Sequence, residues 1–205
     1  MTANEFIERY AKLARSFESY VALGYSEKYT IGMYYHHFCN KRAEPFLLSY
    51  TYDDVLVDLV RDYEVENGYF EVITDVQLHA QCCLPEYDEY FRGYNAILIG
   101  SFRGGNLVIN KQDGAIEIRY TETPDPESVL LGHGCRCAQN GESFLLACLF
   151  CNEEKEKLMF EDTKDYTDEE VERRVRTIAQ KCTEIAGGDQ FQVFWYFHIW
   201  RLRDF

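Results

Sequence analysis

The dipeptide Asp113-Gly114 separates two short segments in which apolar and polar residues alternate, and no other feature of the chain constrains its fold as strongly. Asp and Gly both tolerate the positive φ that a tight turn requires. An Asp-Gly pair between alternating segments is therefore a strong predictor of a β-hairpin. We expect residues 97–120 to form adjacent antiparallel strands, with Asp113-Gly114 at a tight turn.

Apolar periodicity predicts the other strands and helices. Strands are expected at residues 46–52, 69–74, 76–78 and 191–199. Helices are expected at residues 6–17 (with Thr2 or Asn4 as N-cap), at about 26–38, at 55–63 and at 167–186. The last helix begins with a Thr167–Glu170 capping box and ends at Gly187-Gly188. Residues 143–150 suit either a helix or a strand, and residues 152–174, with ten acidic and five basic side chains, are expected to lie outside the core.

The order of these elements is helices, then a mostly antiparallel sheet, then a helix and a strand. That order predicts an α+β fold with helices flanking the sheet. The 205 residues carry no internal repeat and no linker, so we expect a single domain over residues 1–205.

Charge and the lack of long apolar runs restrict the partners. The chain has 35 acidic and 21 basic residues, a formal net charge of −14, which repels nucleic acid and favours a basic protein partner. No apolar run approaches the roughly 20 residues that cross a bilayer, and residues 1–6 do not resemble a signal peptide. We therefore expect a cytoplasmic protein with no membrane partner, whose eight cysteines are free thiols.

Catalytic signatures are missing from the sequence, which has no His-Glu-x-x-His, no Gly-x-Ser-x-Gly and no nucleotide-binding loop. We expect no enzymatic activity and no cofactor. Gly100, Gly104 and Gly105 favour a β-bulge or a sharp turn. A phosphate cradle is the alternative, but the glycines lack the Lys-Ser/Thr of a P-loop and precede a strand.

Two cysteine pairs raise a metal alternative. Cys135 and Cys137, followed by Cys148 and Cys151, have a spacing that would allow four thiolates to surround Zn²⁺. Cys148 also lies in an apolar run, where cysteine commonly acts as a small core residue, and we favour that interpretation. His36-His37 with Cys39 is a weaker metal candidate.

Two clusters combine carboxylates with tyrosines and are the candidate partner-binding surfaces. One contains Asp53, Asp54 and Asp58 with Tyr50 and Tyr52, and the other contains Glu86, Asp88 and Glu89 with Tyr87 and Tyr90. Carboxylates supply steering charge and tyrosines supply rigid anchors. Ordinary solvated acidic surfaces are the alternative. Charge reversal at these groups is predicted to leave stability nearly unchanged, because exposed charges contribute little.

The glycine segment resembles the signature of the SMI1/KNR4-like (SUKH) superfamily. The resemblance rests on Ile99-Gly100-Ser101, on Gly104-Gly105 followed by Asn106, and on the turn Asp113-Gly114 between strands. An earlier helix of that family is similar to the segment from Leu23 to Tyr29, taken with Phe38 and Asn40. A later helix of the family is similar to the segment from Ser143 to Leu146. The match spans about residues 23–149. Gly24 stands where the family usually has Pro, Phe102-Arg103 departs from its glycine cluster, and residues 152–205 form an extension of a helix and a strand.

The resemblance implies a non-enzymatic binder. Bacterial members of the superfamily are taken as immunity proteins that neutralise toxin domains, many of them nucleases with basic substrate-binding surfaces. An acidic chain would suit such a target. The resemblance thus implies an intracellular immunity protein that binds a basic toxin domain. A regulatory scaffold of the same fold and a small zinc-binding protein are the alternatives.

Overall fold

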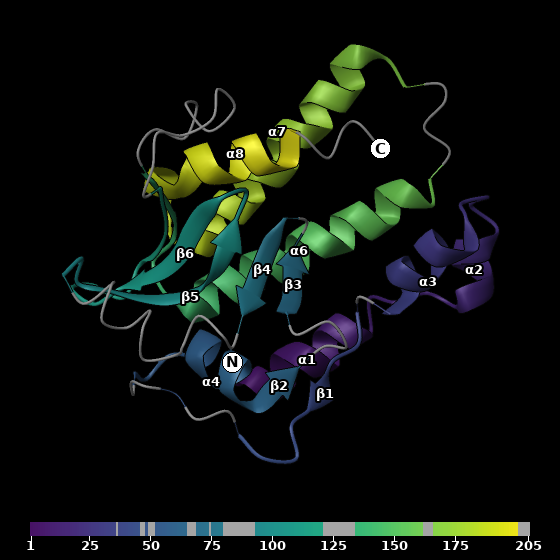
Figure 1. The fold of residues 1–205 in the computed structure, drawn as a ribbon. Helices are drawn as coiled ribbons and strands as arrows, with labels where there is room; N and C mark the ends of the chain where they lie inside the picture. Colours follow the sequence, from purple (N-terminus) through teal and green to yellow (C-terminus); the bar gives the residue numbers. More distant parts are fainter. Residues whose placement is uncertain are drawn as a thin grey trace.

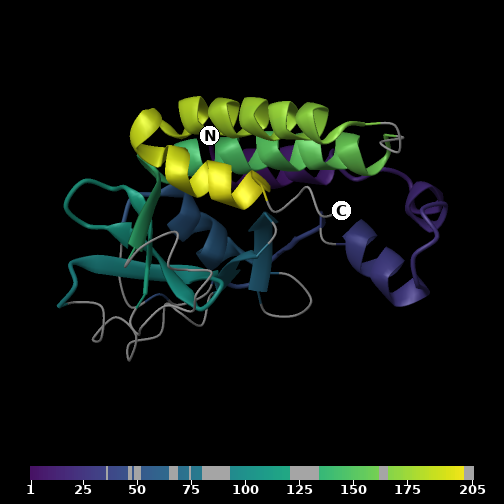
Figure 2. The same cartoon turned by 90° about the horizontal axis from the view of Figure 1, so that it is seen from above.

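A computed structural model describes residues 1–35, 37–45, 48, 52–64, 69–73, 75–79, 93–120, 134–161 and 166–200. In these ranges a six-stranded antiparallel sheet is covered on one face by helices (Figures 1 and 2). The predicted α+β class is confirmed.

The sheet is a meander in which each strand pairs with the next one along the chain, in the order β3-β4-β5-β6-β7-β8. Its strands are β3 (Tyr69–Ile73), β4 (Val76–His79), β5 (Ala96–Phe102), β6 (Gly105–Asn110), β7 (Ile116–Arg119) and β8 (Gly134–Ala138). A separate two-stranded sheet joins β1 (Asn40–Lys41) to β2 (Tyr63–Glu64). The described part of the predicted strand at 46–52 is limited to residues 48 and 52, so that prediction lies largely outside the described residues.

The predicted antiparallel strands at residues 97–120 are confirmed as β5, β6 and β7. The tight two-residue turn lies between β5 and β6, where Arg103 (φ 47°) and Gly104 (φ 77°) both adopt positive φ. Positive φ at both central residues is characteristic of a type I′ turn, whose backbone twist matches the right-handed twist of the strands on either side. The β6–β7 connection at Asp113-Gly114 is longer and spans residues 111–115, with Gly114 at φ 76°.

Gly100 allows β4 and β5 to approach closely. A Cβ at Gly100 would lie 2.0 Å from the backbone oxygen of Gln77, a separation that no side chain can adopt. The β5–β6 register also shifts between Leu98 and Gly100. The predicted bulge and sharp turn at the glycine segment are both confirmed.

Both faces of the central strands are buried, which explains their nearly continuous apolar runs. The face toward the helices includes Ile97, Ile99, Leu107, Ile109, Ile116 and Ile118. The opposite face buries a small cluster of Ala96, Leu98 and Val108. Strands covered on both faces lose the apolar-polar alternation of half-exposed strands.

Helices from both ends of the chain form the layer over the sheet (Figure 2). They are α1 (Ala3–Ala11), α4 (Val55–Asp62), α6 (Gly141–Met159), α7 (Asp168–Ala186) and α8 (Gln192–Trp200). Thr2 forms a capping box with Glu5 at α1, and Thr167 forms the predicted one with Glu170 at α7. Gly187 (φ 120°) ends α7 as expected. Two further helices, α2 (Phe17–Val21) and α3 (Glu27–Tyr35), project as a hairpin beside this layer (Figure 1).

The predicted strand at residues 191–199 is wrong, because this segment is helical. It turns through a short 3-10 helix, η3 (Asp189–Phe191), into α8. Phe191, Phe194, Trp195 and His198 are buried at helical spacing, whereas Val193 is exposed. Almost every residue here is apolar or aromatic, so both periodicities fit the sequence, and packing against α7 and β8 selects the helix. The 152–205 extension therefore contains no described strand.

Two further predictions need correction. The N-terminal helix does not run to Phe17, because α1 ends at Ala11 and Ser16 caps a separate α2. Residues 152–174 do not lie wholly outside the core, because α6 continues to Met159 and buries Asn152 and Glu156. Asn152 donates to the carbonyl oxygen of Val72 at 2.6 Å, which gives a buried amide its partner.

Candidate functional site

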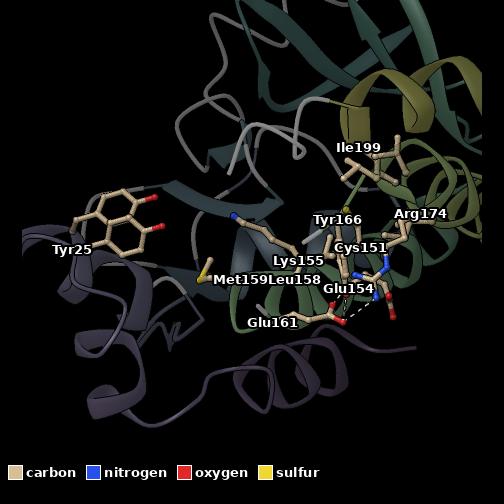
Figure 3. Close-up of a pocket in the computed structure, with 14 residues that line it drawn as sticks. Tyr25, Cys151, Glu154, Lys155, Leu158, Met159, Glu161, Tyr166, Arg174 and Ile199 are labelled. Atoms are coloured by element: carbon tan, nitrogen blue, oxygen red, sulfur yellow. Dashed lines mark hydrogen bonds and ion pairs between the residues drawn. The ribbon is translucent and has the colours of Figure 1, made fainter. Parts of the chain in front are cut away.

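A pocket of about 250 Å³ lies between α6, α7 and α8, with two tyrosines near α3 completing its wall. Figure 3 shows Tyr25 at one end, Ile199 and Arg174 at the other, and Lys155 between them. The lining is mostly apolar, with Leu158 from α6 among its side chains. An apolar concavity with a few polar groups is the usual form of a small-ligand site.

An ion-pair network closes the Arg174 end of the pocket. Arg174 contacts both carboxylate oxygens of Glu161, at 2.6 and 3.1 Å, and Tyr166 donates to the same carboxylate at 2.6 Å. The guanidinium also lies 4.8 Å from the centre of the Tyr166 ring. The hydrogen bonds from Arg174 and Tyr166 lower the pKa of Glu161. The network joins the end of α6 to α7 and is partly exposed, so it positions the wall more than it stabilises the fold.

Cys151 lines the pocket from α6 and is the cysteine among its side chains. The adjoining thiol of Cys182 on α7 lowers its pKa, burial raises that pKa, and the imidazole of His198 on α8 lowers it further. Burial raises the pKa of Cys182.

A buried carboxylate attaches the α2–α3 hairpin to α6. Glu156 accepts a hydrogen bond from the Tyr20 hydroxyl at 2.9 Å, and its other oxygen lies 3.0 Å from Nε2 of His37. Tyr20 is fully buried, and its hydroxyl also accepts from the backbone N–H of Arg15. Burial, countered by the Arg15 N–H and reinforced by the Glu156 carboxylate, raises the pKa of Tyr20. The hairpin is thus held through polar contacts to one helix.

The surface of this hairpin carries large apolar side chains in contact with solvent. Among the described residues, eight large apolar side chains are exposed, and six of them lie between residues 21 and 38. These six, the apolar hairpin surface, are Val21, Tyr25, Tyr29, Ile31, Tyr35 and Phe38. Exposed apolar side chains concentrated in one segment mark interaction sites more often than scattered ones do.

The predicted acidic-aromatic clusters are only partly described. Asp53 is exposed, whereas Asp58 is half-exposed and pairs with Arg61 at 2.8 Å. Tyr52 packs against the core. Tyr50 lies outside the described residues, and so does the whole second cluster, which consists of Glu86, Tyr87, Asp88, Glu89 and Tyr90.

Asp54 is the predicted partner residue for which the structure shows a different role. One carboxylate oxygen accepts from the N–H of Leu56 at 2.8 Å as the N-cap of α4, and the other accepts from the N–H of Gly141 at 2.9 Å. Burial raises its pKa, countered by these two N–H groups. The premise that this carboxylate is exposed is therefore wrong for Asp54, because it is half-buried and joins the starts of two helices.

The cysteine alternative for zinc finds no support in the geometry. In the part of the chain that the structure describes, no group of three or more His, Cys, Asp or Glu side chains is arranged to hold a metal. Cys137 and Cys148 are fully buried, and burial raises the pKa of both thiols. His36 lies outside the described residues, and His37 contacts Glu156. The six described cysteines are free thiols, and Cys82 and Cys83 are not described.

Sequence reasoning missed the residues that form the most distinctive polar contacts. Glu156 lies within a run of charged residues, and its burial depends on the packing of a distant hairpin. The predicted strand at residues 191–199 contains His198 and gives no indication that it lies beside Cys151 and Cys182. Two signals in the sequence could have placed Cys182. The capping box at Thr167 sets the start of α7, and the helical spacing of Cys182 with the other buried residues sets the face of α7 that points inward.

No family model, curated protein or solved structure matches this chain. Among the helices in the described ranges, none combines the length and apolar character needed to cross a bilayer.

Proposed function

We propose that this chain is a non-enzymatic binding protein that docks a basic protein domain on its apolar hairpin surface. The observation that carries the proposal is the concentration of exposed large apolar side chains on residues 21–38. Such side chains lower solubility when they face water, and binding a partner would bury them.

The aromatic groups of the hairpin have the properties of binding anchors. The rings of Tyr25 and Tyr29 lie 4.9 Å apart, and Tyr35 lies 6.4 Å from Phe38. Tyrosine has few rotatable bonds, so fixing it in an interface loses little conformational entropy. Aromatic residues also dominate interface energetics when their pockets exclude water.

The α2–α3 hairpin presents these rings without being part of the main core. Its two helices pack chiefly against each other, and Thr30 and Met33 are the buried residues of α3. Glu156 fixes the hairpin to α6 through Tyr20 and His37. This arrangement supports a surface that stays exposed and yet keeps a defined orientation.

Charge supports a basic partner. A net charge of −14 attracts a basic domain over distances up to the Debye length and speeds its association. The resemblance to SMI1/KNR4-like immunity proteins makes a basic toxin domain our proposed partner, neutralised in the cytoplasm by direct binding.

The experiment compares two exposed tyrosines of equal accessibility. Tyr35 on the hairpin and Tyr94 in the turn before β5 are each 56% exposed. The partner to use is a toxin-like domain identified among the products of the neighbouring genes, purified as an inactive variant and titrated by calorimetry and stopped-flow. We expect Tyr35→Ser to weaken binding about tenfold or more and Tyr94→Ser to change it less than about twofold.

Raising the salt concentration should slow association with the wild-type chain while changing dissociation little, because steering is screened. Equal effects of the two tyrosine variants would exclude the hairpin as the docking surface. Binding without inhibition of the partner would favour a scaffold over an immunity protein.

A further inference from the structure

Three helices bring a thiol pair and an imidazole together at the wall of the pocket. Cys151 comes from the middle of α6, Cys182 from the last turns of α7, and His198 from the end of α8. All three side chains are buried, with Cys151 2% exposed, and Cys151 is the one of the three that lines the pocket. A molecule in the pocket therefore meets the Cys151 sulfur first.

Small side chains let α6 and α7 approach closely at this level. Ala147 on α6 and Ala179 on α7 are both buried there. The Cys182 thiol donates to the carbonyl oxygen of Ala147 at 3.7 Å, one helical turn before Cys151, and it also contacts the Cys151 sulfur. The two thiols therefore adjoin across the helix interface.

His198 is placed to act on Cys151. Its side chain is almost completely buried, and its Nε2 has no hydrogen-bond partner among the described residues. The ring stacks on Phe194 at 5.9 Å and lies edge-on to Trp195 at 6.4 Å, so neighbouring rings restrict its orientation. An imidazole beside a thiol stabilises the thiolate, which is the nucleophilic form of cysteine.

The neighbouring groups favour the same outcome. The adjoining Cys182, the imidazole of His198 and Lys155, which also lines the pocket one turn after Cys151, each lower the pKa of the Cys151 thiol. Desolvation opposes them. A buried thiol that adjoins a second thiol and lines a cavity large enough for a peroxide has the arrangement of an oxidisable cysteine with a resolving partner.

We propose that Cys151 is a modification site for small hydroperoxides and that Cys182 resolves the product as an intramolecular disulfide. The Cys151 thiolate attacks one oxygen of hydrogen peroxide, the O–O bond breaks, and the departing hydroxide takes a proton to become water. Cys151 is then a sulfenic acid. The Cys182 sulfur attacks the Cys151 sulfur, the S–O bond breaks, and a second water leaves with the Cys182 proton. Two thiols are oxidised to one disulfide, and one peroxide is reduced to two waters.

The first test needs only the wild-type full-length chain. The chain is treated with one equivalent of hydrogen peroxide, alkylated, digested and mapped by mass spectrometry. We expect a Cys151–Cys182 disulfide, with the loss of two hydrogen atoms, to form at least about tenfold faster than any product at Cys39, a half-buried thiol whose pKa burial raises strongly. Products at Cys39 or the other cysteines, formed as fast as those at Cys151, would overturn the proposal.

Variants separate the two roles. Cys182→Ser should stop the reaction at a Cys151 sulfenic acid, which dimedone traps, whereas Cys151→Ser should abolish both products and Cys39→Ser should change neither. Circular dichroism and urea unfolding verify that each variant is folded. If Cys151→Ser does not fold, Cys151→Ala is used in its place. If Cys182 still forms a disulfide in the Cys151→Ser variant, another thiol reacts first and the proposal is wrong. The proposal does not depend on the partner of the hairpin, so either can fail alone.

Discussion

The sheet-and-helix body and the α2–α3 hairpin are built on opposite principles. The body buries apolar side chains from both sheet faces and from five helices, and its helices and strands contact one another extensively. The hairpin leaves six large apolar side chains in solvent and is fixed to α6 through the carboxylate of Glu156 and the packing of Tyr20 on Phe160. Burial of apolar side chains stabilises the body. A small number of contacts fixes the orientation of the hairpin, and this leaves its apolar surface available to bind a partner.

The largest effect should come from Gly100→Ala in the body. The added Cβ would lie 2.0 Å from the backbone oxygen of Gln77, so β4 and β5 must separate. We expect a loss of about 3 kcal/mol or more in the free energy of unfolding, measured by urea denaturation. Gly93→Ala is the control, because nothing lies within 4 Å of its added Cβ, and it should change stability by less than about 0.5 kcal/mol.

Glu156→Ala tests whether the hairpin depends on one anchor. The change removes the acceptor for Tyr20 and the contact of His37, and we expect a local loss of roughly 2–3 kcal/mol. Amide hydrogen exchange should become faster across residues 17–35 and stay slow in β5–β7. Glu153→Ala, an exposed neighbour paired with Lys157, serves as the control. Equal acceleration in sheet and hairpin would show that the two regions unfold together.

Asp54→Ala, set against Asp53→Ala, should give the smallest effect. Asp54 accepts from the N–H groups of Leu56 and Gly141, whereas Asp53 is exposed. We expect about 1–2 kcal/mol for Asp54→Ala and almost nothing for Asp53→Ala in thermal or urea unfolding. Indistinguishable variants would mean that Asp54 is a surface charge like its neighbour.

Local chemistry explains what the sequence predicted correctly. The capping box at Thr167, the glycine end of α7 and the positive-φ preference of Gly104 act within a few residues, so the printed sequence contains the necessary information. The antiparallel strands at 97–120 follow from the same short-range signals.

Tertiary contacts determine the features that the sequence did not predict. Residues 191–199 fit both helical and strand periodicity, and only the surfaces of α7 and β8 decide between them. Asp54 and Gly141 are 87 positions apart, so their contact is invisible in a local pattern. The same holds for Glu156, whose partners Tyr20 and His37 belong to a hairpin more than 100 residues earlier.

The meander order of the sheet has a consequence for synthesis on the ribosome. Each strand of β3–β8 pairs with the strand made just before it, so the sheet can assemble progressively as the chain emerges. Its inner side chains, such as Ile97 and Ile116, are packed in a core to which the later helices α6, α7 and α8 contribute. Translation adds about 5–20 residues per second. For several seconds the nascent chain therefore presents an incompletely covered apolar sheet, and in that interval it is most exposed to aggregation.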